Sequence, residues 1–290
     1  MNVKTALRNA TRRIQKRAIA TAALDAELLL AAALGRDRQY VLSHFDKELT
    51  ERQKAILAEM VLRRCNFEPI AYITGTKDFY GRSFFVNRAV LIPRPETELL
   101  VETIIKHGRN KPITIADIGT GSGCIAISLA LALPKATVIA TDISPEAIAV
   151  AKKNARRHKA AVTFTTGNLL EPLEETAFDV LVANLPYMPS EQITKLQPAT
   201  VDPTLELAEQ IPIRFEPIIA LSGGSDGLLL YRRLFEQLAR RTELPAMVAI
   251  EHGENHRAAL IELLESHYPT QAVTLRRDYA KLPRFIIAQR

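Results

Sequence analysis

The chain has 290 residues, of which 47% are hydrophobic and 24% charged, and its formal net charge is +6. That length accommodates one large domain or two unequal ones, and the composition is typical of a folded protein rather than a disordered one. No apolar stretch reaches the roughly 18 residues of a membrane span, and Cys65 and Cys124 have neither metal-type spacing nor the number of a disulfide framework. We therefore expect no membrane segment, no metal site and a location in the reducing cytoplasm.

The N-terminal part of the sequence predicts a small helical bundle over residues 1–66. Six cations precede the first acid, Asp25. An arginine-rich leader without acids also occurs in organelle transit peptides, but this one contains no serine and runs directly into an Ala- and Leu-rich stretch, so we expect the first helix of the fold. Gly35 is expected to end one helix, and Thr50 with Gln53 to form the capping box of another. Such a bundle is either a lid or a docking surface for a macromolecule.

Residues 67–94 predict a linker that contains a hairpin. The runs 70–75 and 78–86 are aromatic, β-branched and punctuated by glycine. Two prolines at 93 and 95 favour an extended segment, and the acids after Pro95 suit the first turn of a helix. We therefore expect the second domain to begin at residue 95.

Strands and helices are predicted to alternate over residues 95–290. The expected strands are 113–118, 137–141, 162–165, 178–183, 247–251, 273–275 and 284–288. The helices expected between them include 124–133, 146–158, 228–241 and 253–266, whereas the proline-rich stretch 188–221 reads as a loop. This alternation predicts an α/β fold with a doubly wound sheet, right-handed crossovers, and ligands at the carboxyl ends of its strands.

A glycine-rich loop follows the first of these strands. Its sequence is Gly119-Thr120-Gly121-Ser122-Gly123, and Asp142 ends the next strand. Glycine allows the backbone to turn sharply close to a ligand, and an acid in this place can accept hydrogen bonds from ribose hydroxyls. The glycines lack the G-x-G-x-x-G spacing, and no G-K-[ST] phosphate loop is present. With Asp117 two residues before the loop, the pattern predicts a ligand without phosphates, such as S-adenosylmethionine; the alternative is an ordinary turn and a surface Asp.

The stretch Asn184-Leu185-Pro186-Tyr187 follows the apolar strand 178–183. Asn184 offers a side-chain oxygen, and Leu185 a backbone carbonyl that the next proline holds extended. Two acceptors and an aromatic ring suit a planar group that bears an NH2. Taken alone, the stretch also fits a strand followed by a proline turn.

Several of these segments resemble the peptide chain release factor N(5)-glutamine methyltransferase family. The similarity covers nearly the whole chain and is carried by residues 25–30, 68–75, 91–98, 117–124 and 184–187. It implies a seven-stranded, Rossmann-like class I methyltransferase domain over 95–290 and a helical domain over 1–66 that docks release factors. The implied reaction is methyl transfer from S-adenosylmethionine to the side-chain amide of the glutamine in a Gly-Gly-Gln motif.

The resemblance also implies roles for individual residues. Asn184 and Tyr187 would be catalytic: Asn184 and the Leu185 carbonyl would each accept a hydrogen from the substrate amide, and Tyr187 would stack on it, with Pro186 completing the substrate site. Pro93 and Arg94 are expected to pack over the site. The residues implied for the co-substrate are Asp117, Gly119, Thr120, Gly121, Ser122, Gly123, Asp142, Asn168, Leu169 and Asn184.

The chain departs from the family pattern in three places. Leu185 stands where the family usually has proline, Asn168 where it has Asp, and His252 follows Glu251 where it has Ile. Asn168 is expected to bond the adenine amino group through its oxygen and Leu169 to cover a ring face, whereas His252 is interpreted as structural.

Two other functions remain open at this level. Asn-Leu-Pro-Tyr is also familiar from ribosomal RNA adenine dimethyltransferases, so adenine-N6 methylation of RNA or DNA is the second hypothesis. That activity favours a basic stripe and aromatic stacking platforms, yet the chain has no tryptophan and its charges are dispersed. A non-catalytic S-adenosylmethionine-binding module is the third hypothesis. We expect a monomer that has release factors as partners and no direct contact with nucleic acid.

Overall fold

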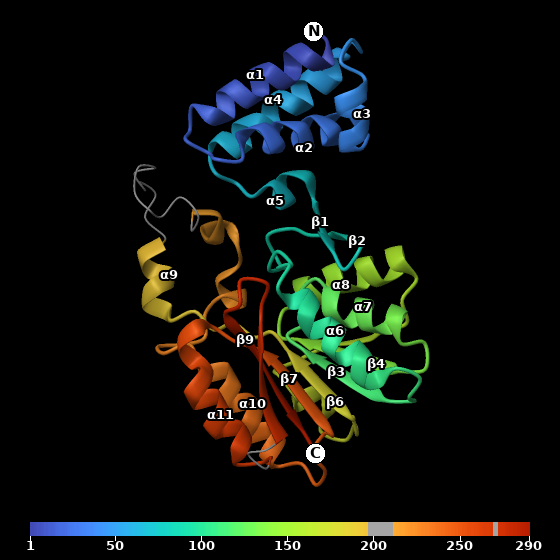
Figure 1. Cartoon of the computed structure of the whole chain (residues 1–290), viewed down its shortest axis with the longest axis vertical. Helices are drawn as coiled ribbons and strands as arrows, with labels where there is room; N and C mark the ends of the chain where they lie inside the picture. Colours follow the sequence, from blue (N-terminus) through green and yellow to red (C-terminus); the bar gives the residue numbers. More distant parts are fainter. Residues whose placement is uncertain (197–210, 269–271) are drawn as a thin grey trace. The chain divides into compact units, whose positions relative to one another are not determined.

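The computed structural model describes residues 1–196, 211–268 and 272–290. The chain divides into two compact units (Figure 1): one comprises Met1–Thr76 with Leu196–Phe215, and the other comprises Lys77–Lys195 with Glu216–Arg290. Within the described ranges, no helix has the length and apolarity needed to cross a membrane. The same ranges contain no group of His, Cys, Asp and Glu side chains that could hold a metal ion.

The first unit is built from helices, as predicted. They are α1 (Val3–Gln15), α2 (Ala22–Leu34), α3 (Arg38–Ser43), α4 (Glu51–Cys65) and α5 (Ile70–Thr74), and the short 3-10 helix η3 (Ile211–Phe215) belongs to the same unit. Gly35 ends α2 in the left-handed conformation, and Thr50 and Gln53 form the predicted capping box of α4. Buried residues recur at helical spacing along α1, so its cations remain on the exposed face.

A buried ion pair joins two helices of this unit. Arg64 Nε of α4 donates to Asp25 Oδ2 of α2 at 2.7 Å, and Thr21 Oγ1 donates to the same oxygen at 2.9 Å. The two charged side chains are 11% and 6% exposed. Because water is largely excluded from both side chains, removal of either one would leave the other charge buried without a partner.

The hairpin prediction is half correct. Strands β1 (Thr76–Phe79) and β2 (Arg82–Phe85) pair with each other, but Ile70–Thr74 forms the helix α5 instead of a strand. Pro69 precedes this helix and Gly75, with φ of 75°, ends it. An apolar run of five residues is too short for its periodicity to distinguish a helix from a strand. The flanking proline and glycine fit either structure, so the sequence did not decide between them.

The second unit contains the predicted seven-stranded sheet. Its strands are β3 (Thr114–Ile118), β4 (Thr137–Asp142), β5 (Thr163–Thr166), β6 (Val180–Ala183), β7 (Met247–Glu251), β8 (Val273–Arg277) and β9 (Pro283–Gln289). They lie in the order β5-β4-β3-β6-β7-β9-β8, parallel except for β9, which runs antiparallel to β7 and β8. The fold class expected from the sequence is confirmed.

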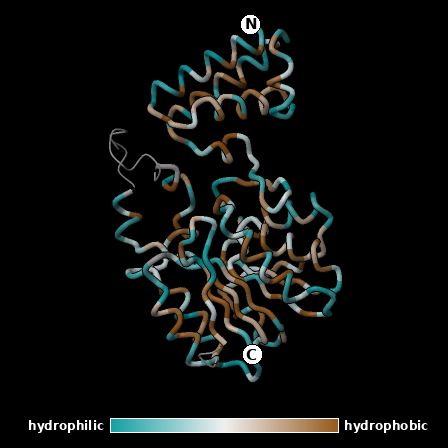
Figure 2. Tube along the Cα trace, in the orientation of Figure 1, coloured by the Kyte–Doolittle hydropathy of each residue, from teal (hydrophilic) through white to brown (hydrophobic). Residues whose placement is uncertain are grey.

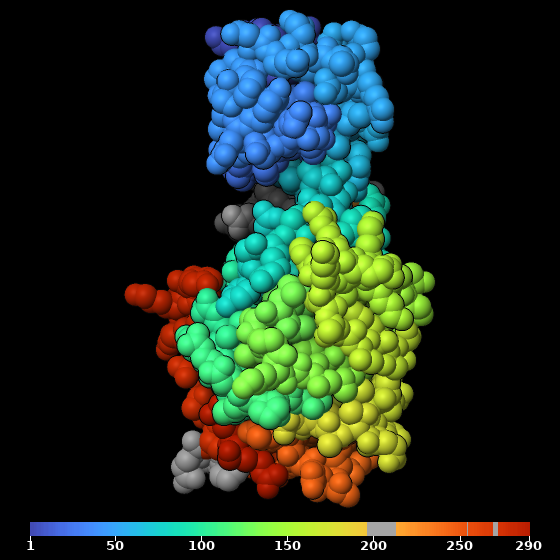
Figure 3. Space-filling view, turned by 90° about the vertical axis from the view of Figure 1, so that its right-hand side faces the viewer, coloured from blue at the N-terminus to red at the C-terminus, as the bar shows by residue number. Residues whose placement is uncertain are grey.

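Helices cover both faces of this sheet (Figures 1 and 3). On one face lie α6 (Thr97–Gly108), α7 (Cys124–Ala132) and α8 (Pro145–His158), whose green atoms form the side of the second unit seen in Figure 3. On the other face lie α10 (Leu229–Ala239) and α11 (Arg257–Glu265). Alternate residues of the central strands enter the two cores, so these strands are apolar on both sides (Figure 2).

Short elements complete the second unit. They are α9 (Ser190–Leu196), of which Leu196 falls in the other unit, and the 3-10 helices η1 (Glu171–Leu173), η4 (Ile218–Ala220) and η5 (Glu254–His256). The stretch 188–221, predicted as a loop, therefore contains helical turns, and its residues 197–210 lie outside the described part of the chain.

The strand order reverses direction between β3 and β6. From β3 the chain continues through α7 to β4 on one side, while β6 is followed by β7 on the other. Such a switch point leaves a crevice at the carboxyl ends of the two strands. These ends are Ile118 and Ala183, next to the glycine loop and Asn184.

Candidate active site

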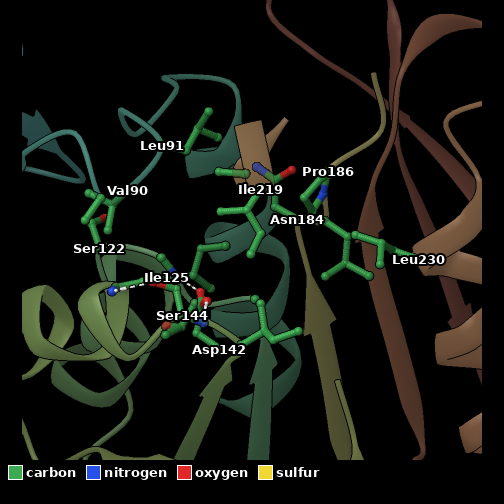
Figure 4. Close-up of a pocket in the computed structure, with 18 of the residues that line it drawn as sticks. Val90, Leu91, Ser122, Ile125, Asp142, Ser144, Asn184, Pro186, Ile219 and Leu230 are labelled. Atoms are coloured by element: carbon green, nitrogen blue, oxygen red, sulfur yellow. Dashed lines mark hydrogen bonds between the residues drawn. The ribbon is translucent and has the colours of Figure 1, made fainter. Parts of the chain in front are cut away.

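A cavity of about 310 Å³ lies at this switch point, a size within the range of small-molecule sites. Every described residue that lines it belongs to the second unit. One wall carries the glycine loop 119–122 with Asp142, and another carries Asn184–Pro186, as Figure 4 shows. The remaining wall is formed by 89–94 and by η4. Eight of the ten residues predicted for the co-substrate, Asn184 among them, line the cavity; Asp117 and Gly123 do not.

The glycine loop presents its backbone to the cavity. Gly119 and Gly121 have φ of 74° and 55°, a conformation that favours glycine. The backbone N–H groups of Gly119 and Thr120 both donate to Thr141 O at 2.9 Å, which fixes the loop to the end of β4. No atom lies within 4 Å of where a Cβ on Gly121 would stand, so the loop leaves open space there.

Asp142 holds the loop and faces the same space. Its Oδ2 accepts from Gly121 N at 2.8 Å and its Oδ1 from Ser144 N at 2.9 Å (Figure 4). Burial raises the pKa of Asp142, although these backbone donors lower it. A carboxylate oxygen has more than one acceptor site, so Asp142 retains capacity for ligand hydroxyls.

Asp117 lies beneath the loop, fully buried. Its Oδ2 accepts from Thr120 Oγ1 at 2.6 Å and from Ala126 N at 3.2 Å, so it ties the loop to α7. In the part of the chain that the structure describes, Oδ1 has no hydrogen-bond partner. Burial raises the pKa of Asp117 to about 7. An unpartnered buried acceptor behind the loop suits the ammonium group of an amino-acid ligand, directly or through water.

Asn168 and Leu169 line the cavity beside Asp142. Asn168 Nδ2 donates to Glu171 Oε1 at 2.7 Å, which leaves its Oδ1 to accept from a ligand amino group. Leu169 has φ of 54°, and its carbonyl accepts from Thr141 Oγ1 at 2.9 Å. This strained backbone, held by the hydrogen bond from Thr141, presents the Leu169 side chain to the cavity.

Asn184 is held by two residues that the sequence analysis did not identify. Its Nδ2 donates to Thr97 Oγ1 at 3.3 Å, and Thr97 Oγ1 donates to Glu251 Oε2 at 2.6 Å. Thr97 begins α6 and Glu251 ends β7, and both are almost completely buried. A Thr in the first turn of a predicted helix and an acid at a strand end were visible in the sequence, but nothing there joined them to Asn184.

Leu185 packs against the glycine loop. A Cβ placed on Gly119 would come within 2.9 Å of Leu185 Cδ2, and the Leu185 side chain is buried. The carbonyl of Leu185 lies 3.4 Å from the hydroxyl of Tyr231. That hydroxyl has a single hydrogen, which it donates to the closer carbonyl of Glu251. The Leu185 carbonyl therefore keeps its capacity to accept a hydrogen bond. The leucine that replaces the family's usual proline therefore fills space under the loop.

Tyr187 does not line the cavity. Its ring lies against Gly253, where a Cβ would come within 3.0 Å of Tyr187 Cδ2, and its centroid is 6.3 Å from that of His256. Burial raises the pKa of its hydroxyl to about 12. Stacking of Tyr187 on a substrate amide stays a prediction. His252, interpreted as structural, is buried, and its Nδ1 lies 2.8 Å from Gly253 O.

A second glycine-rich stretch supports the Asn184–Tyr187 loop from behind. A Cβ on Gly223 would come within 2.7 Å of Pro186 O, and one on Gly227 within 2.3 Å of Tyr187 O. The backbone of Met188 also pairs with Leu221 and Gly223. The sequence signal was the glycine density of 222–227, which reflects this close approach of two backbones.

The wall formed by residues 89–94 contains Pro93 and Arg94, as expected. Glu216 holds this segment, because its carboxylate accepts from Ile92 N at 3.0 Å and from Arg94 Nη2 at 2.5 Å. Among the described residues that line the cavity, Arg94 carries the only positive charge, and Glu216 balances it. With Asp142 on the opposite wall, the site disfavours phosphate groups, and its donor and acceptor set fits S-adenosylmethionine.

Comparisons with known proteins agree with this arrangement. Residues 5–75 match the family described as PrmC N-terminal domain, and residues 95–201 match the methyltransferase small domain. A release factor glutamine methyltransferase from Geobacter sulfurreducens is 43% identical over 76% of this chain and 72% of its own length. One from Koribacter versatilis is 35% identical over 100% of this chain and 99% of its own length.

Solved structures show the same fold at low identity. The catalytic domain of hMettl16 in complex with a MAT2A 3′UTR hairpin has a TM-score of 0.55 and 17% identity, over 83% of this chain and 82% of that one. The T. thermophilus 16S rRNA methyltransferase RsmC, in complex with AdoMet and guanosine, has a TM-score of 0.50 and 15% identity, over 74% of this chain and 49% of that one.

Proposed function

This chain belongs to the release factor glutamine methyltransferase family, and we propose that it methylates the side-chain amide of the glutamine in the Gly-Gly-Gln motif of peptide chain release factors. It is an S-adenosylmethionine-dependent protein-glutamine N-methyltransferase. The observation that carries the proposal is the position of Asn184, whose amide lines the cavity opposite the glycine loop (Figure 4).

The co-substrate side consists of the glycine loop, Asp142, Asn168 and Leu169. Asp142 would accept from the ribose hydroxyls, Asn168 Oδ1 from the adenine amino group, and Leu169 would cover an adenine face. The buried Oδ1 of Asp117 would balance the ammonium group of the methionine moiety. When bound, S-adenosylmethionine supplies a methyl group on its sulfonium; the bond from sulfur to that carbon breaks as a bond to the substrate nitrogen forms, and the nitrogen loses a proton to water.

The acceptor side must activate a poor nucleophile. The lone pair of an amide nitrogen is delocalised into its carbonyl, so the nitrogen attacks slowly. Asn184 Oδ1 and the Leu185 carbonyl would each accept one of its hydrogens, which favours the positive charge that develops on nitrogen and aims the lone pair at the methyl group. No side-chain general base is needed for this step.

Adenine-N6 methylation would use the same pair of acceptors. A nucleobase, however, is usually held by stacking on aromatic or guanidinium planes. None of the described residues that line the cavity is aromatic, and Arg94 is engaged with Glu216. The cavity therefore favours a glutamine side chain over a base.

The test is methyl transfer from labelled S-adenosylmethionine to a release factor, with ribosomal RNA as the competing substrate. We expect label in the release factor, and none in a variant whose Gly-Gly-Gln glutamine is replaced by alanine. Label in the RNA and not in the protein would reject the proposed function.

The proposal extends to partners and location. The helical unit would dock the release factor, and the enzyme would act as a monomer. We also propose that it acts in the cytoplasm, where its substrate takes part in translation, and that it reaches its substrate without binding nucleic acid directly.

A further inference from the structure

We propose that Thr97 and Glu251 are positioning residues that set which end of the Asn184 amide faces the substrate. The three residues come from three elements: Thr97 from the start of α6, Asn184 from the end of β6 and Glu251 from the end of β7. The hydrogen bonds join residues 87 and 154 positions apart in the chain. This inference rests on the proposed function and adds a requirement to it.

The problem that these residues solve is the two-fold ambiguity of an asparagine. One end of the amide donates through NH2 and the other accepts through oxygen, and a half-turn of the terminal torsion exchanges them. Only the oxygen end can accept a hydrogen from a substrate amide. If the NH2 group of Asn184 faced the substrate, its hydrogens would point at the hydrogens of the substrate amide, and the two groups would repel each other.

The hydroxyl of Thr97 removes this ambiguity. It has a single hydrogen, and at 2.6 Å that hydrogen goes to Glu251 Oε2, which as a carboxylate can only accept. Thr97 Oγ1 can therefore only accept from its other neighbour, Asn184, which must turn its NH2 group inward at 3.3 Å. The Asn184 oxygen is then free for the cavity, which Thr97 also lines.

The surroundings of Glu251 keep this chain of hydrogen bonds in place. This residue is only 2% exposed, so its side chain is shielded from water that would compete with the Thr97 hydroxyl. Its backbone carbonyl accepts from the hydroxyl of Tyr231, a completely buried residue of α10. Glu251 is thus fixed by the sheet on one side and by the tyrosine on the other.

The experiment compares Thr97→Val with Thr97→Ser in the full-length enzyme, with a release factor as substrate. Valine keeps the shape of threonine but loses the hydroxyl, so we expect kcat to fall by roughly 10–100-fold through misorientation of Asn184. The dissociation constant for S-adenosylmethionine and the KM for the release factor should stay at wild-type values. Serine keeps the hydroxyl and should recover most of the turnover.

A matched control lies on the same helix. Thr103 Oγ1 donates to Leu99 O at 2.8 Å inside α6 and does not line the cavity, so Thr103→Val should leave kcat unchanged. If Thr97→Val kept wild-type kcat, or if serine failed to rescue while the melting temperature fell equally in both variants, Thr97 would only fill space and the inference would be wrong. A wild-type enzyme that left the release factor unmethylated would instead reject the proposed function.

Discussion

At the residue scale, the glycine motif combines residues that line the cavity with residues that lie behind its lining. Asp117 and Gly123 are both part of the glycine motif, yet neither lines the cavity: Asp117 ties the loop to α7, and Gly123 precedes that helix. Asn184 and Asp142 do line it. A motif therefore mixes both kinds of residue, and position in the sequence does not distinguish them.

Asn184→Ala tests the acceptor role directly. We expect turnover to fall by the equivalent of about 2–4 kcal/mol of activation free energy, as for other single positioned polar groups, with little change in affinity for S-adenosylmethionine. Single-turnover kinetics and calorimetric titration measure the two quantities. Glu262→Ala, on the exposed surface of α11 in the second unit and outside the cavity lining, serves as control. Turnover near the wild-type value would show that Asn184 is not the acceptor.

Gly119→Ala and Gly121→Ala test the contact between the loop and Leu185. Both glycines have positive φ, but only the Cβ at 119 meets a neighbour, Leu185 Cδ2 at 2.9 Å. We expect Gly119→Ala to lower the free energy of unfolding by about 1 kcal/mol more than Gly121→Ala, because crowding adds to the shared backbone strain. Urea denaturation measures the difference; equal losses would show that Leu185 yields freely.

The ionisation of Glu251 predicts a pH dependence of turnover. Burial raises its pKa to about 7 from 4.5, while the hydrogen bond from Thr97 and the charges of Arg284 and Arg94 lower it and that of Glu96 raises it. Ionised Glu251 can only accept from the Thr97 hydroxyl, which fixes the orientation of Asn184, whereas protonated Glu251 could also donate to that hydroxyl. We therefore expect kcat to rise as the pH increases through about 7. In Glu251→Gln this rise should disappear.

The same carboxyl should act on stability with the opposite sign. Between pH 4.5 and about 7 the folded protein retains a proton that the unfolded chain releases, so its contribution to the free energy of unfolding falls as pH rises. Asp117 also has a pKa raised to about 7, so its contribution to the pH dependence of the free energy of unfolding should persist in Glu251→Gln. Chemical denaturation and kcat, measured over this pH range for both proteins, separate the two groups; identical profiles would contradict the role of Glu251.

At the element scale, prediction succeeded where a segment carries its own signal. The capping box of α4 and the glycine end of α2 depend on residues within one turn of each other, so the sequence was sufficient. It failed for α5 and α9, which are short. Helices of five to seven residues depend on packing rather than on periodicity.

The ion pair between α2 and α4 predicts a large effect of a single substitution. Asp25→Ala leaves the Arg64 cation, whose side chain is only 11% exposed, without its carboxylate partner. We expect a loss of about 3 kcal/mol in the free energy of unfolding. Glu51→Gln, which removes an exposed pair with Lys54 from the same helix α4, should lower the free energy of unfolding far less than Asp25→Ala, because water screens that pair. Urea denaturation measures both; similar small losses would show that water reaches Arg64.

At the scale of the whole molecule, the two units have separable expected roles. All described lining residues of the cavity belong to the second unit. Deletion of residues 1–66 should therefore spare the binding of S-adenosylmethionine and raise the KM for a release factor, because the proposed docking surface is lost. Calorimetry and steady-state kinetics give the two results, and an unchanged KM would leave the helical unit without a docking role.

The sequence by itself was enough to predict the sheet, its glycine loop, Asp142 and the Asn184–Tyr187 stretch. Each of these features depends on residues that are close together along the chain. Only the tertiary structure joined Thr97 and Glu251 to Asn184, and Glu216 to Arg94, across separations of 87 to 154 residues. The physical reason is that a hydrogen bond between distant segments leaves no period in either of them. That packing turns the NH2 group of Asn184 toward Thr97 and leaves its oxygen for the cavity.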